Sequence, residues 1–180
     1  MSVFKAFAPG VEVNGETVLS VVTGVPGGEG LALEILSESG ITDPQPGKWY
    51  SQQAWLDAFK KLSEQVGPRT LFSIGKAIPA NAKWPPTVTS IETALPSIDI
   101  AYHMNHRGGD IGTYAYQALG EHKAKVVCRN PYPCDFDRGI VTSVATRFKP
   151  ASVAVVTTTH DDTQPCRSKG ADSCTYLVEW

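Results

Sequence analysis

Apolar residues recur at three- and four-residue spacings through the first half of the chain, the pattern of helices with one buried face. Ser51 stands where it can cap the clearest of these helices. The apolar residues of that helix form one stripe: Trp55, Leu56, Phe59, Leu62 and Val66. Further helices are expected over 69–78 and from 90 to about 105, with Pro96 marking a kink or a second helix start.

After Gly109 the pattern changes to short segments rich in β-branched and aromatic residues. A helix capped by Asp135 or Asp137 and ending at Phe148 is expected among the strands. The predicted strands are 112–119, 123–129, 152–159 and 173–180. This order predicts an α+β fold, with N-terminal helices packed on a small antiparallel sheet and a C-terminal hairpin-helix-hairpin unit.

Composition narrows the class of protein. With 180 residues, of which 42% are hydrophobic and 19% charged, the chain is expected to form one domain over 1–180. The net charge of −2 argues against a protein that binds a nucleic acid or an anionic membrane surface, because both kinds of binding need concentrated positive charge. No apolar run approaches the roughly 20 residues of a membrane span. The N-terminus shows no signal-peptide pattern, so a cytoplasmic protein is expected.

Four cysteines lie in the last third of the chain, in two pairs with five and seven intervening residues. The reducing cytosol favours free thiols or metal thiolates over disulfides. Neither gap is the tight Cys-x-x-Cys of zinc ribbons, so the spacing leaves both readings open. The cysteines are Cys128, Cys134, Cys166 and Cys174.

Other polar groups carry weaker signals. His103 and His106 share a face near a predicted helix end, where they could contact a ligand, a metal or a heme edge, or simply complement the helix dipole. The carboxylates in turns are explained by capping and solvent rather than by acid–base chemistry: Asp135, Asp137, Asp161 and Asp162. The chain has no Gly-x-Ser-x-Gly elbow and no phosphate-loop lysine. The sequence therefore leans away from an enzyme.

Large aromatic residues gather in the helical part and at the start of the sheet. Such residues form cores, and a pocket between helices and sheet would also be lined by them, with a hydroxyl or imidazole orienting the ligand. The candidate ligand-binding residues are Trp55, Phe59, Phe72, Tyr102, His103, His106, Tyr114 and Tyr116.

Two C-terminal segments resemble a known protein family: 130–140 (NPYPCDFDRGI) and 165–176 (PCRSKGADSCTY). They resemble the ending of 4-vinyl-reductase-type sensory domains, which are related in fold to heme-NO-binding domains and to TRAPP subunits. The resemblance implies a non-enzymatic sensory domain that encloses a small hydrophobic or aromatic molecule between helices and sheet and acts on a signalling partner. The alternatives it leaves open are a tetrapyrrole-related, 4-vinyl-reductase-like enzyme, a heme-binding sensor, and an assembly or tethering subunit that forms a homodimer.

The resemblance also bears on cofactors. Aromatic-sensing members of that family hold zinc with an upstream Cys, a Glu three residues before a second Cys, and a third Cys after seven more residues. Cys166 and Cys174 match the last interval, but Thr163 stands at the glutamate position. The upstream thiolate would be Cys134 or Cys128, and the missing donor would come from Cys128, His160, Asp161 or Asp162. A structural zinc is therefore the implied cofactor. Heme is disfavoured, because the Tyr-x-Ser-x-Arg motif of heme-NO-binding domains is absent.

Overall fold

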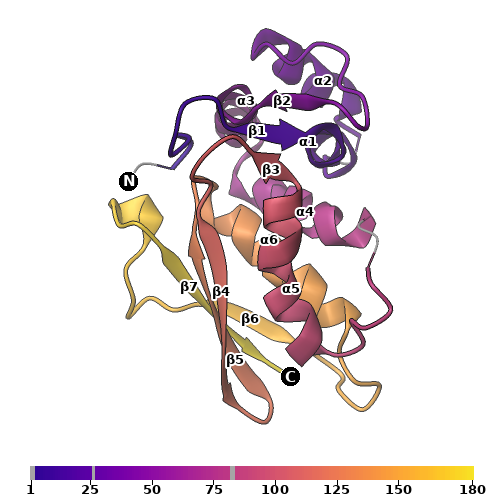
Figure 1. Ribbon diagram of the computed structural model, residues 1–180, viewed down its shortest axis with the longest axis vertical. Coiled ribbons are helices and arrows are strands. Elements are labelled where there is room, and N and C mark those ends of the chain that lie inside the picture. The colour runs from indigo at the N-terminus through magenta and orange to yellow at the C-terminus, as the bar shows by residue number, and fades with distance from the viewer. Residues whose placement is uncertain (1–2, 26, 82–83) are drawn as a thin grey trace.

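A computed structural model describes residues 3–25, 27–81 and 84–180, and it confirms the predicted α+β fold. Figure 1 shows α1–α3 with three short strands at one end of the molecule, and a four-stranded sheet with α4–α6 beside it. In chain order the elements are β1 (Glu12–Asn14), α1 (Gly15–Thr23), α2 (Glu29–Glu38), β2 (Trp49–Ser51), α3 (Gln52–Val66), α4 (Pro68–Asn81), α5 (Ile91–Met104), β3 (His106–Arg107), β4 (Thr113–Gly120), β5 (Lys123–Arg129), α6 (Cys134–Arg147), β6 (Thr157–His160), a 3₁₀ turn (Arg167–Lys169) and β7 (Cys174–Glu179).

Three short strands join the N-terminal helices to the rest of the chain. They pair in the order β2-β1-β3, all antiparallel. Each strand leads directly into, or out of, a helix: β1 into α1, β2 into α3, and α5 into β3. The N-cap Asn14 accepts a hydrogen bond from the Thr17 amide at 3.0 Å, and Ser51 caps α3 as the sequence predicted. This small sheet therefore fixes where α1, α3 and the end of α5 meet.

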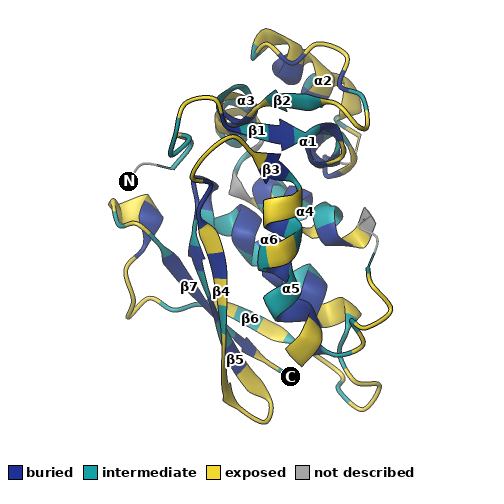
Figure 2. Ribbon diagram, viewed as in Figure 1, coloured by how far each residue is buried: buried dark blue, intermediate teal, exposed yellow. Residues whose placement is uncertain are grey.

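The larger sheet has the strand order β4-β5-β7-β6, with every neighbouring pair antiparallel. Alternate residues of β5 are buried, as expected for a sheet with one covered face: Ala124, Val126 and Cys128. The helices α5 and α6 cover that face, and α4 packs on the far side of α6. Figure 2 shows the burial concentrated between helices and sheet, while the tip of the β4–β5 hairpin is exposed.

Two glycines allow α4 and α6 to approach at backbone distance. A Cβ atom on Gly75 would meet the carbonyl oxygen of Phe136, and one on Gly139 would meet the carbonyl oxygen of Phe72. Either side chain would force the helices apart. This contact fixes α6, which carries both Cys134 and Phe136.

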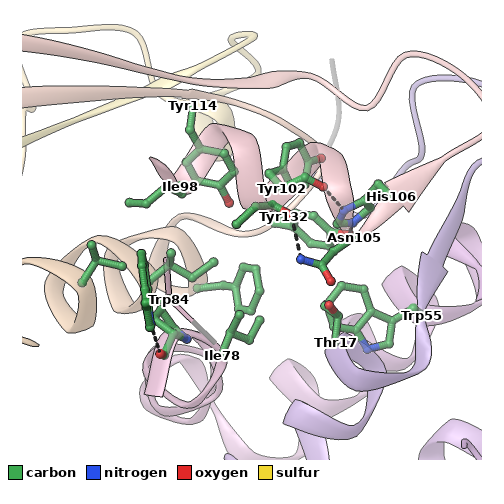
Figure 3. Close-up of a pocket in the computed structure, with 15 residues that line it drawn as sticks. Thr17, Trp55, Ile78, Trp84, Ile98, Tyr102, Asn105, His106, Tyr114 and Tyr132 are labelled. Carbon is green, nitrogen blue, oxygen red and sulfur yellow. Dashed lines mark hydrogen bonds between the residues drawn. The ribbon is translucent and has the colours of Figure 1, made fainter. Parts of the chain in front are cut away.

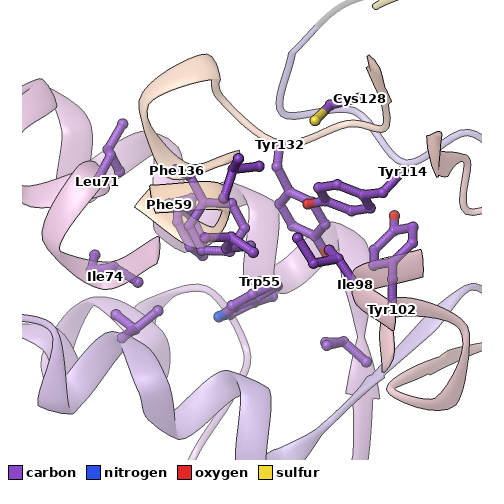
Figure 4. Packing of buried hydrophobic residues seen from close by; sticks show 14 of the residues in the cluster. Trp55, Phe59, Leu71, Ile74, Ile98, Tyr102, Tyr114, Cys128, Tyr132 and Phe136 are labelled. Atoms are coloured by element: carbon purple, nitrogen blue, oxygen red, sulfur yellow. The ribbon is translucent and has the colours of Figure 1, made fainter. Parts of the chain in front are cut away.

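A cluster of aromatic rings fills the space where α3 meets α6 (Figure 4). The ring of Trp55 packs edge-on against Phe59, with ring centroids 4.6 Å apart, and against Tyr132 at 5.2 Å. Phe136 packs against Phe59 at 5.0 Å. Edge-to-face packing of this kind is favourable for aromatic rings, so the cluster is a tight core rather than an open cleft.

The structure corrects three local expectations. Pro96 lies within one continuous helix, α5, and marks no second start. The strand predicted over 152–159 begins only at Thr157, which is paired with Glu179, the last residue of β7. The first helical residue of α6 is Cys134 and its N-cap is Pro133, so neither Asp135 nor Asp137 caps the helix.

The predicted helix stripe is confirmed for the four residues from Trp55 to Leu62, all of them fully buried. The side chain of Val66 lies outside the described residues. Within the described residues, no helix has the length and apolarity that crossing a bilayer requires.

Candidate functional site

A cavity of about 80 Å³ lies between α5, α6 and the end of α4; we call it the inner cavity. Figure 3 shows its labelled side chains arranged around the hollow, from Trp84 on one side to His106 on the other. Its wall is almost entirely apolar, because aromatic rings and branched aliphatic side chains supply most of it. They include Trp55, Ile78, Trp84, Ile98, Tyr102, Tyr114, Tyr132, Phe136, Ile140 and Val144.

Three polar side chains beside the inner cavity are linked by hydrogen bonds. The Tyr132 hydroxyl lies 2.6 Å from His106 Nε2 and 3.0 Å from Gln52 Nε2, which donates to it. His106 Nδ1 lies 2.9 Å from the Tyr102 carbonyl oxygen. Since a carbonyl can only accept, Nδ1 carries the proton and Nε2 accepts from Tyr132. The imidazole is therefore neutral and fully engaged.

Two further hydroxyls on the wall are also engaged. Tyr102 donates to the Ile111 carbonyl oxygen at 2.5 Å, and Tyr114 donates to Asp137 Oδ1 at 2.5 Å. Burial raises the pKa of each of the tyrosines 102, 114 and 132, so all three remain protonated donors. The tyrosine hydroxyls and the imidazole are thus satisfied within the protein, and the hollow itself is suited to an apolar group.

Burial of His106 makes folding stability depend on pH. The pKa of His106 is lowered from 6.5 to about 4, mainly by burial; the bond to the Tyr102 carbonyl opposes the shift and nearby His103 adds to it. Between these values the unfolded chain binds a proton that the folded chain does not. The free energy of unfolding is therefore highest above pH 6.5, and protonation of His106 in the unfolded chain lowers it by about 3 kcal/mol as the pH drops towards 4.

Urea unfolding of the wild type and of His106→Gln, at several pH values from 7.5 to 4, checks this expectation, and His103→Gln is the matched control. The wild type and the control should lose stability more steeply than His106→Gln over this range. Equal slopes for all three proteins would contradict it.

The structure brings together four of the eight predicted ligand-binding residues and places the others elsewhere. Trp55, Tyr102, His106 and Tyr114 line the inner cavity. Phe59 lies in the ring cluster behind Trp55, and Phe72 lies under the Arg138 guanidinium. The remaining two are His103, whose side chain is 49% exposed and faces Asp99, and Tyr116, which is partly buried on β4. The ligand contacts themselves remain a prediction.

A second group of side chains forms a candidate metal centre. One ligand atom from each of Cys134, His160, Cys166 and Cys174 lies within 4.8 Å of the others. The Sγ atom of Cys166 is 3.8 Å from both of the other sulfurs. A tetrahedral zinc with Zn–S bonds of about 2.3 Å holds its sulfurs about 3.8 Å apart. The remaining pair, Cys134 and Cys174, is 3.1 Å apart.

The histidine of this group has the environment of a metal ligand. Within the described part of the chain, Nε2 of His160 is buried and has no hydrogen-bond partner. Nδ1 of the same ring lies 2.9 Å from Asp162 Oδ1. A carboxylate on the outer nitrogen is the usual support for a metal-bound imidazole. The donors present therefore fit a zinc ion.

Backbone and side-chain donors surround the sulfurs. The Arg167 backbone amide donates to Cys174 Sγ at 3.3 Å, and Ser168 Oγ lies 3.0 Å from Cys166 Sγ. The hydrogen bond with Cys134, followed by those from Arg167, lowers the pKa of Cys174 to about 3 despite its burial. Zinc binds the thiolate form, and the hydrogen bonds from Arg167 would also stabilise Cys174 in that form when the metal is bound.

Cys128 lies outside the group of four. It is buried in β5 opposite Cys174, and burial raises the pKa of its thiol. His160 occupies the place that the sequence left open among Cys128, His160 and two aspartates. The structure brings three of the four predicted cysteines together with His160, and metal binding stays a prediction.

A buried ion pair joins the candidate metal centre to the inner cavity. The side chains of Arg167 and Asp137 are 2% and 0% exposed, and Arg167 Nη2 pairs with Asp137 Oδ2. Arg167 also donates to the Asn130 carbonyl oxygen at 2.7 Å. Burial raises the pKa of Asp137, whereas Arg167, Tyr114 and Asn130 favour its charged form. Asp137 thus connects Arg167, beside Cys174, with Tyr114 on the cavity wall.

Some site residues were missed by the sequence analysis. Tyr132 lies in the segment 130–140, which was used only for the family resemblance, and Asp137 was expected to cap a helix or to face solvent. The only sequence features that could have drawn attention to them are the position of the aromatic Tyr132 next to Pro133 and that of the Asp137 carboxylate seven residues after Asn130. Neither signal identifies a partner, because Arg167 and His106 come from distant parts of the chain.

Comparisons with known proteins show which fold this chain shares, but they identify no family. No protein-family model matches the sequence, and no curated protein matches it. Solved structures of H-NOX proteins match most of it. One from S. oneidensis in the Fe(II) state has a TM-score of 0.68 at 17% identity, covering 92% of this chain and 95% of its own. A mutant of T. tengcongensis H-NOX has a TM-score of 0.66 at 15% identity, covering 92% and 96%. The chain therefore has the fold of the heme-NO-binding domains, as expected. Likeness to 4-vinyl reductases or to TRAPP subunits remains a prediction.

Proposed function

We propose that this chain is a sensory domain with the H-NOX fold that binds a small apolar molecule in the inner cavity, without heme. The observation that carries the proposal is a hollow lined by apolar side chains, beside which the tyrosine hydroxyls and the imidazole are already bonded to partners. Such a hollow offers an occupant mainly dispersion contacts, because its tyrosine hydroxyls and imidazole already have partners.

Heme does not fit these residues, although heme is named for two of the structural neighbours. An iron ligand needs a free nitrogen that faces the cavity. Both nitrogens of His106 are engaged, and His103 is half exposed beside Asp99. The rings of Trp55, Tyr132 and Phe136 occupy the space beside the hollow. A volume of about 80 Å³ is also far below the roughly 300–1,000 Å³ of pockets for larger ligands.

The volume also limits the ligand. An engineered apolar cavity that holds benzene measures about 150 Å³. The inner cavity has about half that volume, which favours aliphatic groups of three or four carbons over aromatic rings. The sequence analysis also allowed an aromatic ligand, and such a ligand would require the cavity wall to widen.

Zinc would support this function structurally. A zinc ion held by Cys134, His160, Cys166 and Cys174 would supply a fixed cross-link and no reaction. Cys134 lies between Tyr132 and Phe136, which both line the cavity. A fixed Cys134 therefore holds that part of the wall in place. We extend the proposal to the whole of 1–180 as one non-enzymatic domain that passes a change in packing to a signalling partner.

Thermal unfolding in the presence of cyclopropane tests the proposal. A ligand that binds only the folded state raises its stability, by about 2.7 kcal/mol at a concentration one hundred times its Kd. The variant Ala101→Leu, which fills the cavity from α5, should abolish the rise in Tm, whereas Ala118→Leu on the exposed part of β4 should retain it.

An equal rise in both variants would contradict the proposal. A heme absorbance band that appears when hemin is added to the wild type, and that disappears in His106→Gln, would favour the heme-binding alternative instead.

A further inference from the structure

A second hollow lies next to the inner cavity, and it is open to solvent. We call it the outer vestibule; its volume is about 300 Å³. It is lined mainly by α1, with Ile78 of α4 and Asn105 at the end of α5. Thr17, Ile78 and Asn105 line both hollows, so these three side chains form the boundary between them. Figure 3 shows these three side chains along one side of the inner cavity.

The outer vestibule presents hydrogen-bond acceptors. The Ser20 hydroxyl donates to the Thr17 carbonyl oxygen at 2.6 Å, and the Thr23 hydroxyl donates to the Ser20 carbonyl oxygen at 3.2 Å. A hydroxyl has a single hydrogen to donate, so both oxygens offer only lone pairs to a ligand.

A carboxylate adds negative charge to these acceptors. Glu16 Oε1 accepts from the Gly47 amide at 3.0 Å, and the carboxylate is exposed. Among the residues that the structure describes, the lining contains no lysine, arginine or histidine. The vestibule is therefore complementary to a donor, and above all to a cation, and it is unfavourable for an anion.

The two hollows together describe an amphipathic ligand. The inner cavity has room for a small apolar group, and its tyrosine hydroxyls and imidazole are engaged. A charged group placed there would lose its hydration without compensation. In the vestibule the same group stays in contact with water while its apolar part is buried, as lysine side chains do at protein surfaces.

We propose that the ligand is a small alkylamine whose apolar group of three or four carbons fills the inner cavity and whose ammonium lies in the outer vestibule beside Glu16. The inference rests on the proposed function, because it places the apolar part in the inner cavity. The ammonium would donate to the Glu16 carboxylate and to the oxygens of Ser20 and Thr23. Thr17 and Asn105 would flank the passage between the two hollows.

Three probes that share one isobutyl group test the inference: isobutylammonium, isobutanol and isovalerate. Methyl NMR of the full chain, purified with zinc in the buffer, follows each titration. The methyl signals of Ile98 and Ile140 report on the inner cavity, and that of Thr23 reports on the vestibule. Isobutylammonium should bind about threefold more tightly than isobutanol, and isovalerate about threefold more weakly, as expected for an exposed charge pair. Isobutylammonium should also shift the Thr23 methyl signal.

A matched pair of variants isolates the charge of Glu16. Glu16→Gln keeps an oxygen for the Gly47 amide and should remove the advantage of isobutylammonium over isobutanol. Glu29→Gln changes an exposed acidic residue in the first turn of α2, away from the vestibule, and should leave the advantage intact.

The outcomes separate the two proposals. Equal affinities for the three probes, or an advantage that survives Glu16→Gln, would overturn the alkylamine inference while leaving the inner cavity as a binding site. If no probe shifts the signals of Ile98 and Ile140, the proposed function itself fails.

Discussion

The Cys174→Ser variant is expected to lose its metal ion and more than about 4 kcal/mol of folding stability, a loss typical of a removed structural metal site. Cys174 supplies a sulfur to the group of four and accepts hydrogen bonds from the Arg167 amide and side chain. A serine hydroxyl is a poor zinc ligand and leaves His160 Nε2 without a metal to bind. Elemental analysis and urea unfolding of protein purified without added zinc measure the two effects.

Cys128→Ser is the matched control, because Cys128 is a buried cysteine directly opposite Cys174 but lies outside the group. It should keep one equivalent of zinc and lose only about 1–3 kcal/mol, the usual penalty of burying a hydroxyl. If both variants are equally stable, or if wild-type protein free of metal unfolds at the same urea concentration as metal-loaded protein, the metal centre is refuted.

The Arg167→Met variant is expected to lose about 3–5 kcal/mol, because Asp137 would remain buried with its charge unpaired. Burial already raises the pKa of Asp137, and without Arg167 that pKa would rise further. A carboxyl whose folded pKa lies above its unfolded value favours folding at low pH and opposes it as pH rises. The destabilisation should therefore be larger at pH 7 than at pH 4, which urea unfolding at the two pH values measures.

The double variant Arg167→Met, Asp137→Asn separates a lost charge partner from lost packing. An asparagine can still accept from Tyr114 and needs no cation, so the double variant should recover at least half of the lost stability at pH 7. A double variant as unstable as the single one would show that Arg167 stabilises the fold by contacts other than its charge pair with Asp137.

The sequence predicted those helices and strands that are long enough for their pattern of apolar and polar residues to repeat. The stripe of α3 spans two turns, and β5 was predicted with its observed bounds because it alternates over seven residues. The strands β1, β2 and β3 have two or three residues each, too few for any alternation to show. Their pairing nevertheless positions His106 and Thr17 at the cavity. The sequence therefore could not predict how the N-terminal helices meet the sheet.

The metal centre was predicted in part for a similar reason. The interval from Cys166 to Cys174 was visible in the sequence, but the resemblance left the upstream thiolate open between Cys134 and Cys128. His160 became a clear candidate only when β6 paired with β7, which sets it opposite Tyr176, two residues from Cys174. For Asp137 the local signal was misleading, because α6 begins at Cys134 and carries that carboxylate inward to Arg167. Long-range pairing decided both cases.

A crystal of the protein under xenon pressure tests the central claim most directly. Xenon is apolar and small, and it occupies dry cavities in proteins. We expect an anomalous peak in the inner cavity between Ile98, Tyr114 and Phe136, with the bond between His106 and Tyr132 intact. Side chains that fill this space and leave no xenon peak would contradict a ligand-binding domain.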